Sequence, residues 1–346
     1  MNKFQLNIYF VSLLSFALSF LLNYSIYIIS KIFKYKISSS NLQKRLVNNN
    51  IPPLGGVATS ITFYISAYFL GKADDIFITV GFFGLLMSIL GFFDDFLNFN
   101  WKVKLILQIL IVTIPITQLN IFINFETLIN LDLHNNLNYI VSIFWVVLII
   151  NSINFIDNMD GLAVVVTGSI CFQIIILTYV LNQNKLTDIS IILFFILMGF
   201  FILNFPPAKL YLGDSGSLFL GFVLGFTSIL FTWNNGPTNS PVYAFSPILL
   251  FFTIPILDFL VVFKHRMKNK IKVTTGGTDH ISHRLLAKGF NEKKVLFAFF
   301  IYSLFIFLFV LIYVFFNSIN PIYLLIIYLI QFTFTYNYLI NLKELQ

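Results

Sequence analysis

Two adjacent aspartates, Asp94 and Asp95, stand at the end of a long apolar stretch of this sequence. Neighbouring carboxylates repel each other unless a cation or a proton lies nearby, so such a pair is suited to bind Mg²⁺ or to act as a general base. The same dipeptide, Asp74-Asp75, precedes that stretch beside Lys72, and there we expect only a solvated loop. The pair alone is therefore weak support for a site.

A second polar segment carries Asn151, Asn154, Asp157 and Asp160, which recur at every third position. Asn151, Asn154 and Asp157 would share one face of a helix, so their amide and carboxylate oxygens would line one side of a helix end. Asparagines in membrane helices also serve as hydrogen-bonding contacts between helices, and that structural interpretation stays open. The two carboxylates in the set favour a functional site.

A glycine-rich segment, Gly213 to Ser217, places Asp214 and Ser215 immediately before another apolar stretch. Glycine lets the backbone approach a ligand, and the N-terminus of a following helix favours negative charge. An anion with its metal could therefore bind here. A glycine turn in which Asp214 or Ser215 caps the helix fits these residues equally well.

Two histidines, His280 and His283, stand next to Arg284 in a basic segment. Histidine and arginine donate hydrogen bonds to phosphate oxygens, so the segment indicates phosphate binding. Zinc is a rival ligand for paired histidines, but no cysteine accompanies them, since the single cysteine, Cys171, lies within an apolar run.

The elements that position these residues must be membrane helices. Of 346 residues, 58% are hydrophobic and 10% are charged, and the mean hydropathy is +0.89, whereas soluble domains carry about 25% charged residues. Apolar runs of about 20 residues, long enough to cross a bilayer as helices, recur along the whole chain. We predict an all-α polytopic membrane protein, one domain over residues 1–346 with about eleven transmembrane helices. The predicted spans are 7–30, 55–70, 76–93, 104–119, 139–156, 162–181, 189–206, 217–233, 244–263, 295–316 and 320–340.

The distribution of charge predicts the orientation of these spans. Of the 21 lysines and arginines, all but Lys3, Lys72 and Lys185 fall on one side of the predicted spans. Basic residues concentrate in cytoplasmic loops, so we expect the N-terminus outside and the active-site loops in the cytoplasm. Residues 264–294 would form a long cytoplasmic loop able to meet anionic headgroups of the lipid bilayer. This topology explains the net charge of +7, and we expect no nucleic-acid partner.

Taken in order, these segments resemble the polyprenyl-phosphate N-acetylhexosamine-1-phosphate transferases of glycosyltransferase family 4. These membrane enzymes make the first lipid-linked sugar in cell-surface polysaccharide synthesis. The resemblance runs from about residue 45 to about residue 285 and rests on several ordered motifs rather than on any single one. The matching segments are Pro52 to Gly56, Asp94-Asp95, Asn151 to Gly161, Gly213 to Ser217, Asp258, and the segment of His280 and His283.

The resemblance implies transfer of a sugar 1-phosphate from a UDP-sugar to undecaprenyl or another polyprenyl phosphate, with release of UMP. It implies an enzyme of the inner, or cell, membrane that requires Mg²⁺, with Mn²⁺ as the alternative. It further implies that Asp214 and Asp95 bind the metal, and which of Asp94 and Asp95 acts as the base stays open. The residues implied to be catalytic are Asp94, Asp95, Asp157, His280 and His283, and those implied to bind substrate are Lys104, Asn151, Asn154, Asp160 and Arg284.

Departures from the family pattern bear on the sugar. Asn98 stands where a third acidic residue often follows the aspartate pair, and Ser282 stands where some members carry a further histidine. The histidine triplet of the branch that uses UDP-N-acetylmuramoyl-pentapeptide is also absent, which favours UDP-N-acetylglucosamine or a related UDP-N-acetylhexosamine. Phospho-N-acetylmuramoyl-pentapeptide transferase is the alternative within the family, and a homodimer is compatible with the sequence.

A proton-coupled membrane transporter is the alternative from another class, because transporters also carry intramembrane carboxylates and broken helices. A transporter should hold its charged side chains near the bilayer midplane. In this sequence they gather at one predicted surface, which favours the enzyme.

Overall fold

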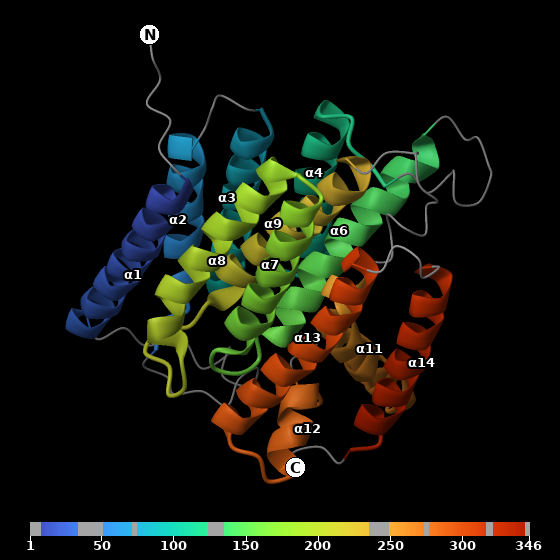
Figure 1. Cartoon of the computed structure of the whole chain (residues 1–346). Coiled ribbons are helices and arrows are strands. Elements are labelled where there is room, and N and C mark those ends of the chain that lie inside the picture. Colours follow the sequence, from blue (N-terminus) through green and yellow to red (C-terminus); the bar gives the residue numbers. More distant parts are fainter. Residues whose placement is uncertain are drawn as a thin grey trace.

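The computed structural model describes residues 8–33, 51–70, 75–123, 135–234, 249–272, 277–315 and 321–342. Within these ranges the chain is helical and contains no strand (Figure 1). The helices are α1 (Ile8–Ile32), α2 (Gly55–Leu70), α3 (Asp75–Leu97), α4 (Trp101–Gln118), α6 (Asn136–Ile156), α7 (Leu162–Val180), α8 (Asn184–Asn204), α9 (Gly213–Asn234), α11 (Thr253–Lys268), α12 (Ile281–Ala287), α13 (Glu292–Phe315) and α14 (Pro321–Ile340).

The helices confirm the prediction of an all-α polytopic membrane protein. In the described part of the chain, 9 helices are long and apolar enough to cross a bilayer. Helix α2 coincides with the predicted span 55–70, and α11 overlaps the second half of the predicted span 244–263. Each has 16 residues, slightly short of the usual length for a helix that crosses the hydrocarbon layer unaided. The beginning of the predicted span 244–263 lies outside the described residues.

The predicted loop 264–294 needs correction, because much of it is helical. Helix α11 continues to Lys268, α12 occupies Ile281–Ala287, and α13 begins at Glu292. The last turn of α11 carries His265, Arg266 and Lys268, and cationic side chains stabilise the negative end of a helix dipole. Hydropathy marked the end of the apolar residues, whereas the helix extends into the charged ones.

Helix α9 lies at the centre of the bundle and is almost completely buried. It is apolar on all sides, as expected for a helix surrounded by other helices. Glycines let its neighbours come close: a Cβ at Gly91 of α3 would lie 2.3 Å from the carbonyl oxygen of Asp214, and a Cβ at Gly221 would lie 2.5 Å from Cα of Ile150 in α6. Small residues allow such close crossings of membrane helices. These contacts bring the ends of α3 and α6 to the start of α9.

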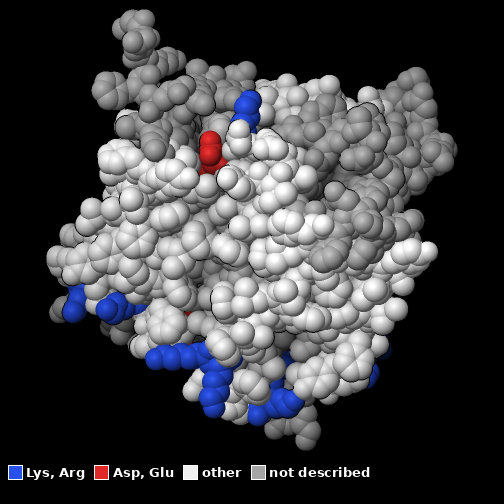
Figure 2. Space-filling model, in the orientation of Figure 1, with Lys and Arg blue, Asp and Glu red and all other residues white. Residues whose placement is uncertain are grey.

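The basic side chains gather at the lower end of the bundle in Figure 2. Among the described lysines and arginines, Lys185 in the first turn of α8 is the exception, at the upper end. Asp75 begins α3 at the end opposite to Asp94, while Asp74 lies outside the described residues. The asymmetry of charge found in the sequence is thus an asymmetry between the two ends of the folded bundle.

Candidate active site

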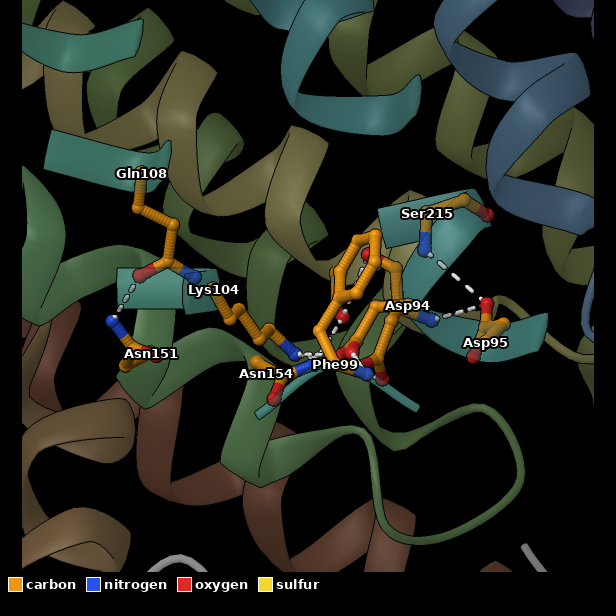
Figure 3. Close-up of polar contacts among 10 residues, drawn as sticks. Asp94, Asp95, Phe99, Lys104, Gln108, Asn151, Asn154 and Ser215 are labelled. Carbon is orange, nitrogen blue, oxygen red and sulfur yellow. Dashed lines mark hydrogen bonds and ion pairs between the residues drawn. The ribbon is translucent and has the colours of Figure 1, made fainter. Parts of the chain in front are cut away.

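Lys104 joins two carboxylates that lie far apart in the sequence. Its Nζ is 2.7 Å from Oδ2 of Asp94 and 2.6 Å from Oδ2 of Asp214 (Figure 3). The exposed fractions of the side chains are 14% for Lys104, 8% for Asp94 and 18% for Asp214. Like charges that are shielded from water repel strongly, so the ammonium group is what allows these two carboxylates to lie together.

A short connection between α3 and α4 places Lys104 opposite Asp94. The connection turns at Asn98, which has a φ of 50°, a left-handed conformation that asparagine tolerates better than most residues. The backbone N–H of Phe99 donates to Oδ1 of Asp94 at 2.9 Å, and the side chain of Asn100 caps the start of α4. Asn98, which the sequence marks as a departure from the family pattern, therefore serves the turn itself.

Asp95 caps the N-terminus of α9. Its Oδ2 accepts a hydrogen bond from the backbone N–H of Asp214 at 2.9 Å and has a longer contact of 3.5 Å with N of Ser215. The preceding Gly213 has a φ of +76°, and a Cβ there would lie 2.3 Å from the carbonyl oxygen of Pro53. A carboxylate at the positive end of a helix is stabilising. The predicted roles of Asp95 in metal binding and catalysis stay predictions.

Asn154 connects α6 to the same cluster. Its Nδ2 donates to Oδ1 of Asp214 at 3.0 Å and to Oγ of Ser217 at 2.8 Å. With Lys104 on Oδ2, both oxygens of Asp214 are held by neighbouring side chains. The structure therefore brings together Asp94, Lys104, Asn154 and Asp214, four residues from four helices.

Gln108 is a polar residue of this region that the sequence reasoning missed. It is completely buried, and its Oε1 accepts from Nδ2 of Asn151 at 2.9 Å (Figure 3). Its Nε2 is buried without a hydrogen-bond partner. Its position could have revealed it, because Gln108 comes four residues after Lys104 and therefore lies on the same face of α4. Asn151 is thus held by a neighbouring helix, in agreement with the structural interpretation, while its role in substrate binding stays a prediction.

The other two members of the third-position pattern lie where α6 ends. Asp157 is the C-terminal capping residue of α6 and is half-buried. Asp160 accepts a hydrogen bond from the backbone N–H of Ala208 at 2.8 Å, which ties the connection after α6 to the connection before α9. Asp160 therefore has a structural role. The predicted substrate contacts of Asp157 and Asp160 stay predictions.

The histidine segment packs against the end of α6. The ring of His280 meets the ring of Phe155 edge to face, with 5.8 Å between centroids, and the hydroxyl of Ser282 donates to Oδ1 of Asn158. Phe155 directly follows Asn154, so His280 lies beside the end of the helix that reaches Asp214. Ser282, the second departure from the family pattern, holds this packing together.

Arg284 is buried and bound to backbone oxygens. Its exposed fraction is 1%, its Nε donates to the carbonyl of Asp279 at 2.9 Å, and its Nη1 donates to the carbonyl of Leu342 at 2.8 Å. The arginine therefore fastens the segment before α12 to the end of α14. Its predicted contact with a diphosphate stays a prediction, and the geometry found here is that of a structural residue.

Asp279 forms a bidentate ion pair with Arg266 of α11, with distances of 2.7 and 2.8 Å. Burial by itself would raise the pKa of Asp279, but the hydrogen bonds and charge of the Arg266 guanidinium outweigh burial and hold the pKa below its ordinary value. This carboxylate therefore stays ionised at neutral pH and keeps the histidine segment attached to α11.

The donors of the cluster suit a hard cation. In the described ranges, no three side chains of His, Cys, Asp or Glu are grouped to hold a metal ion. Asp94 and Asp214 nevertheless offer carboxylate oxygens beside one another, and Mg²⁺ commonly binds one or two carboxylates together with phosphate oxygens of a substrate. The residues fit a cation that is completed by substrate rather than one enclosed by protein.

Comparison with known proteins shows which family this sequence belongs to. The sequence profile of glycosyl transferase family 4 matches residues 77–232, a range that contains Asp94, Lys104, Asn154 and Asp214. A phospho-N-acetylmuramoyl-pentapeptide-transferase of Staphylococcus aureus (strain JH9) is 30% identical over 222 residues, which cover 57% of this chain and 68% of that protein. The chain belongs to glycosyl transferase family 4. The resemblance drawn from the ordered motifs is confirmed at this level.

Two further relatives are similar to this chain, and one of them has a name that differs from that of the S. aureus protein. The "probable undecaprenyl-phosphate N-acetylglucosaminyl 1-phosphate transferase" of Bacillus subtilis (strain 168) is 32% identical over 219 residues, 62% of this chain. The match spans 59% of that protein's length. A phospho-N-acetylmuramoyl-pentapeptide-transferase of Staphylococcus carnosus (strain TM300) is 28% identical over 296 residues, 79% of this chain and 88% of that protein.

The substitution Lys104→Met tests the shared cation of the cluster. Without the ammonium group, two shielded carboxylates face each other, and we expect the free energy of unfolding to fall by about 3 kcal/mol. Thermal or denaturant unfolding in detergent micelles measures this loss. The control is Lys102→Met, on an exposed position of the same helix, which should unfold like the unsubstituted protein. Equal stability of the two variants would contradict the role given to Lys104.

The pH dependence of stability tests the buried state of His283. Its exposed fraction is 1%, and burial, assisted by nearby His280, lowers its pKa from 6.5 to about 4. Between about pH 4 and about pH 6.5 the unfolded chain binds more protons at this histidine than the folded protein does. The contribution of neutral His283 to the free energy of unfolding is therefore complete above about pH 6.5 and falls as the pH drops toward 4. The ion pair of Asp279 is lost only at lower pH, because its pKa is depressed below 3.8.

The substitution His283→Gln should therefore flatten the decline of the unfolding midpoint between about pH 6.5 and about pH 4. Unfolding midpoints of both proteins in detergent, measured across this range, give the comparison. At pH 8, where no histidine proton is exchanged, the same pair of proteins reports the cost of the substitution itself. An unchanged slope in the variant would show that His283 is not held neutral by the fold.

Proposed function

We propose that this protein transfers N-acetylglucosamine 1-phosphate, or a related N-acetylhexosamine 1-phosphate, from a UDP-sugar to undecaprenyl or another polyprenyl phosphate, releasing UMP. The observation that carries this proposal is the Lys104 cluster at the basic end of an apolar helical bundle. The relatives support it, because the B. subtilis protein is named for transfer of N-acetylglucosaminyl 1-phosphate to undecaprenyl phosphate.

The reaction needs positioning and the neutralisation of charge more than it needs covalent chemistry by the protein. An oxygen of the lipid phosphate forms a bond to the β-phosphorus of the UDP-sugar, and the bond from that phosphorus to the bridging oxygen breaks, so UMP leaves with the electron pair. Lys104 offsets negative charge beside Asp94 and Asp214. Either Asp94 or Asp95 would accept the proton of the lipid phosphate.

Asp214 is the proposed leading ligand of a divalent cation, with a member of the Asp94-Asp95 pair as the second. Asp95 already caps α9, whereas Asp94 shares a counter-ion with Asp214, which favours Asp94 as the partner. A bound Mg²⁺, or Mn²⁺ as the alternative, would neutralise oxygens of the diphosphate. Asn151, Asn154, Asp157 and Asp160 are proposed to face the nucleotide sugar, and His280 and His283 to face its phosphates.

The place of the cluster in the bundle favours this enzyme over the transporter. A proton-coupled transporter would carry its charged residues near the midplane, whereas Asp94, Lys104 and Asp214 lie where α3 ends and where α4 and α9 begin. These helix ends share the end of the bundle that holds the basic side chains. Positive residues favour the cytoplasmic side, so we propose that the site faces the cytoplasm from the cell membrane.

An apolar cavity supports a lipid substrate. It has a volume of about 190 Å³ and lies among α11, α12, α13 and α14. Two of its lining residues, Leu257 and Ile281, are chain neighbours of Asp258 and His280. A hydrocarbon chain in this cavity would therefore begin beside the histidine segment, with its phosphate at the polar end of the bundle. The cavity is completed by Ile254, Ala298, Phe299, Tyr302, Thr335, Tyr338 and Leu339.

Transfer can be tested in inverted membrane vesicles, whose cytoplasmic face is open to added substrate. UDP-N-acetylglucosamine should give a lipid-linked sugar phosphate and UMP there, and should give none in sealed right-side-out vesicles. Chelation of divalent cations should stop the reaction, and added Mg²⁺ or Mn²⁺ should restore it. UDP-N-acetylmuramoyl-pentapeptide as the sole productive donor would select the alternative within the family. Failure of every UDP-N-acetylhexosamine, UDP-N-acetylmuramoyl-pentapeptide included, would sink the transferase proposal.

Asp214→Asn should lower turnover by about 100-fold, since it removes a charge that acts on the phosphates in the transition state. The matched control is Asp188→Asn, near the start of α8 at the opposite end of the bundle, and this variant should keep nearly full turnover. The unfolding midpoints of both variants show whether the fold is retained. Full turnover of a folded Asp214→Asn variant would remove this residue from the proposed metal site.

Ala298→Trp tests the cavity, because an indole at this lining position would fill the space proposed for the lipid tail. We expect KM for polyprenyl phosphate to rise by about tenfold or more, while KM for the UDP-sugar stays the same. The neighbouring Phe297 is 63% exposed on the outer surface of α13, so Phe297→Trp is the control and should leave both constants unchanged. An unaltered lipid KM in Ala298→Trp would exclude the cavity as the tail site.

A further inference from the structure

Asp258 of α11 is a buried carboxylate that binds two adjacent groups of the histidine segment. Its Oδ2 lies 2.8 Å from Nδ1 of His280, and its Oδ1 accepts the backbone N–H of Ile281 at 2.8 Å. The exposed fractions are 1% for Asp258 and 6% for His280. Neither the predicted catalytic set nor the predicted substrate-binding set includes Asp258.

With Asp258 ionised, its contact with the ring places the hydrogen of His280 on Nδ1. An ionised carboxylate has no hydrogen to donate, so a contact with Nδ1 is a hydrogen bond only when Nδ1 carries the hydrogen. Nε2 is then the nitrogen left for another partner. A carboxylate or carbonyl on one ring nitrogen commonly sets the tautomer and the orientation in which the other nitrogen is presented.

The ring of His280 is also held by α6. The edge-to-face contact with Phe155 fixes it against α6, one residue beyond the Asn154 that binds Asp214. The bond between Ser282 and Asn158 fastens the same two segments. Asp258 and Phe155 together therefore restrict His280 to one orientation at the end of the bundle where the transfer is proposed.

We propose that Asp258 is a positioning residue that fixes His280 with hydrogen on Nδ1 and directs Nε2 to a phosphate oxygen of the substrates. This inference rests on the proposed function and deepens it. When Nε2 also carries hydrogen the ring is positively charged, and the Asp258 carboxylate bound to Nδ1–H supplies the opposite charge. The Nε2–H then makes a charge-assisted hydrogen bond to phosphate, which is about twice as strong as a neutral one.

Asp258→Asn should move the hydrogen of His280 from Nδ1 to Nε2, because the new amide group presents a donor to the ring. The backbone N–H of Ile281 can only donate, so it selects the amide oxygen of the new side chain and leaves the amide NH₂ facing His280. The imidazole can change tautomer, whereas the peptide group cannot. We therefore expect His280 in this variant to accept at Nδ1 and to carry its hydrogen on Nε2 as a neutral ring.

Nitrogen NMR of histidine-labelled protein in nanodiscs measures this change without any assay of activity. The signals of His280 are assigned by their loss in His280→Gln. In the unsubstituted protein Nδ1 should give the signal of a protonated nitrogen, and in Asp258→Asn it should give that of an unprotonated one. Asp279→Asn is the control, because it breaks the ion pair with Arg266 without touching Nδ1, and its Nδ1 signal should stay protonated.

Kinetics then separate positioning from a merely structural role. Asp258→Asn should lower kcat/KM for transfer by about tenfold, the ratio expected when a charge-assisted hydrogen bond becomes a neutral one. In a His280→Ala background the same substitution should cost nothing further, because Asp258 then has no ring to orient. A structural role would instead give additive losses in the double variant.

Three results would overturn the inference: an Nδ1 that stays protonated in Asp258→Asn, unchanged kcat/KM in a variant whose tautomer has switched, or additive losses in the double variant. If the unsubstituted protein transfers no sugar phosphate at all, the proposed function fails on that result alone. The NMR comparison would still decide whether Asp258 sets the tautomer of His280. The two failures are therefore distinguishable.

Discussion

The polar end of this bundle depends on one ammonium group placed between two carboxylates. Asp94 lies in the last turn of α3, Lys104 in the first turn of α4, and Asp214 in the first turn of α9. Their mutual contacts hold three helix ends together at one point of a molecule that is otherwise apolar. Removing charged groups from water is costly, so such a cluster persists only where close packing enforces it. Gly91 supplies that packing, because it lets α3 touch the backbone of Asp214.

Several polar residues hold helix ends and connections in place at the polar end of the bundle. Asp95 caps α9, Asp160 binds the backbone of Ala208, and Arg284 binds the end of α14. These contacts make the surroundings rigid, and a rigid surrounding is what the transfer of a phosphoryl group requires. His280 lies on the edge of the same region with one nitrogen bound to Asp258. A phosphate that enters would thus contact side chains that hydrogen bonds to neighbouring residues already hold in place.

The sequence predicted the helices well because most of the apolar runs have the length that a bilayer demands. It also predicted which segments carry the site, since oxygen-bearing side chains are rare in such a chain. It could not predict Gln108 as the partner of Asn151, nor that Asp95 caps α9, because both contacts join residues distant in sequence. Arg284 looked like a phosphate ligand by its residue type, whereas its burial against backbone oxygens of the last helix follows only from the fold.

In the proposed reaction the sugar leaves UDP together with one phosphorus atom. UDP-N-acetylglucosamine labelled with ³²P in the β-phosphate and supplied with polyprenyl phosphate decides this directly. Transfer of a sugar 1-phosphate places the label in the lipid product and leaves UMP unlabelled. Label recovered in UDP, with an unlabelled sugar on the lipid, would show ordinary glycosyl transfer and would contradict the account.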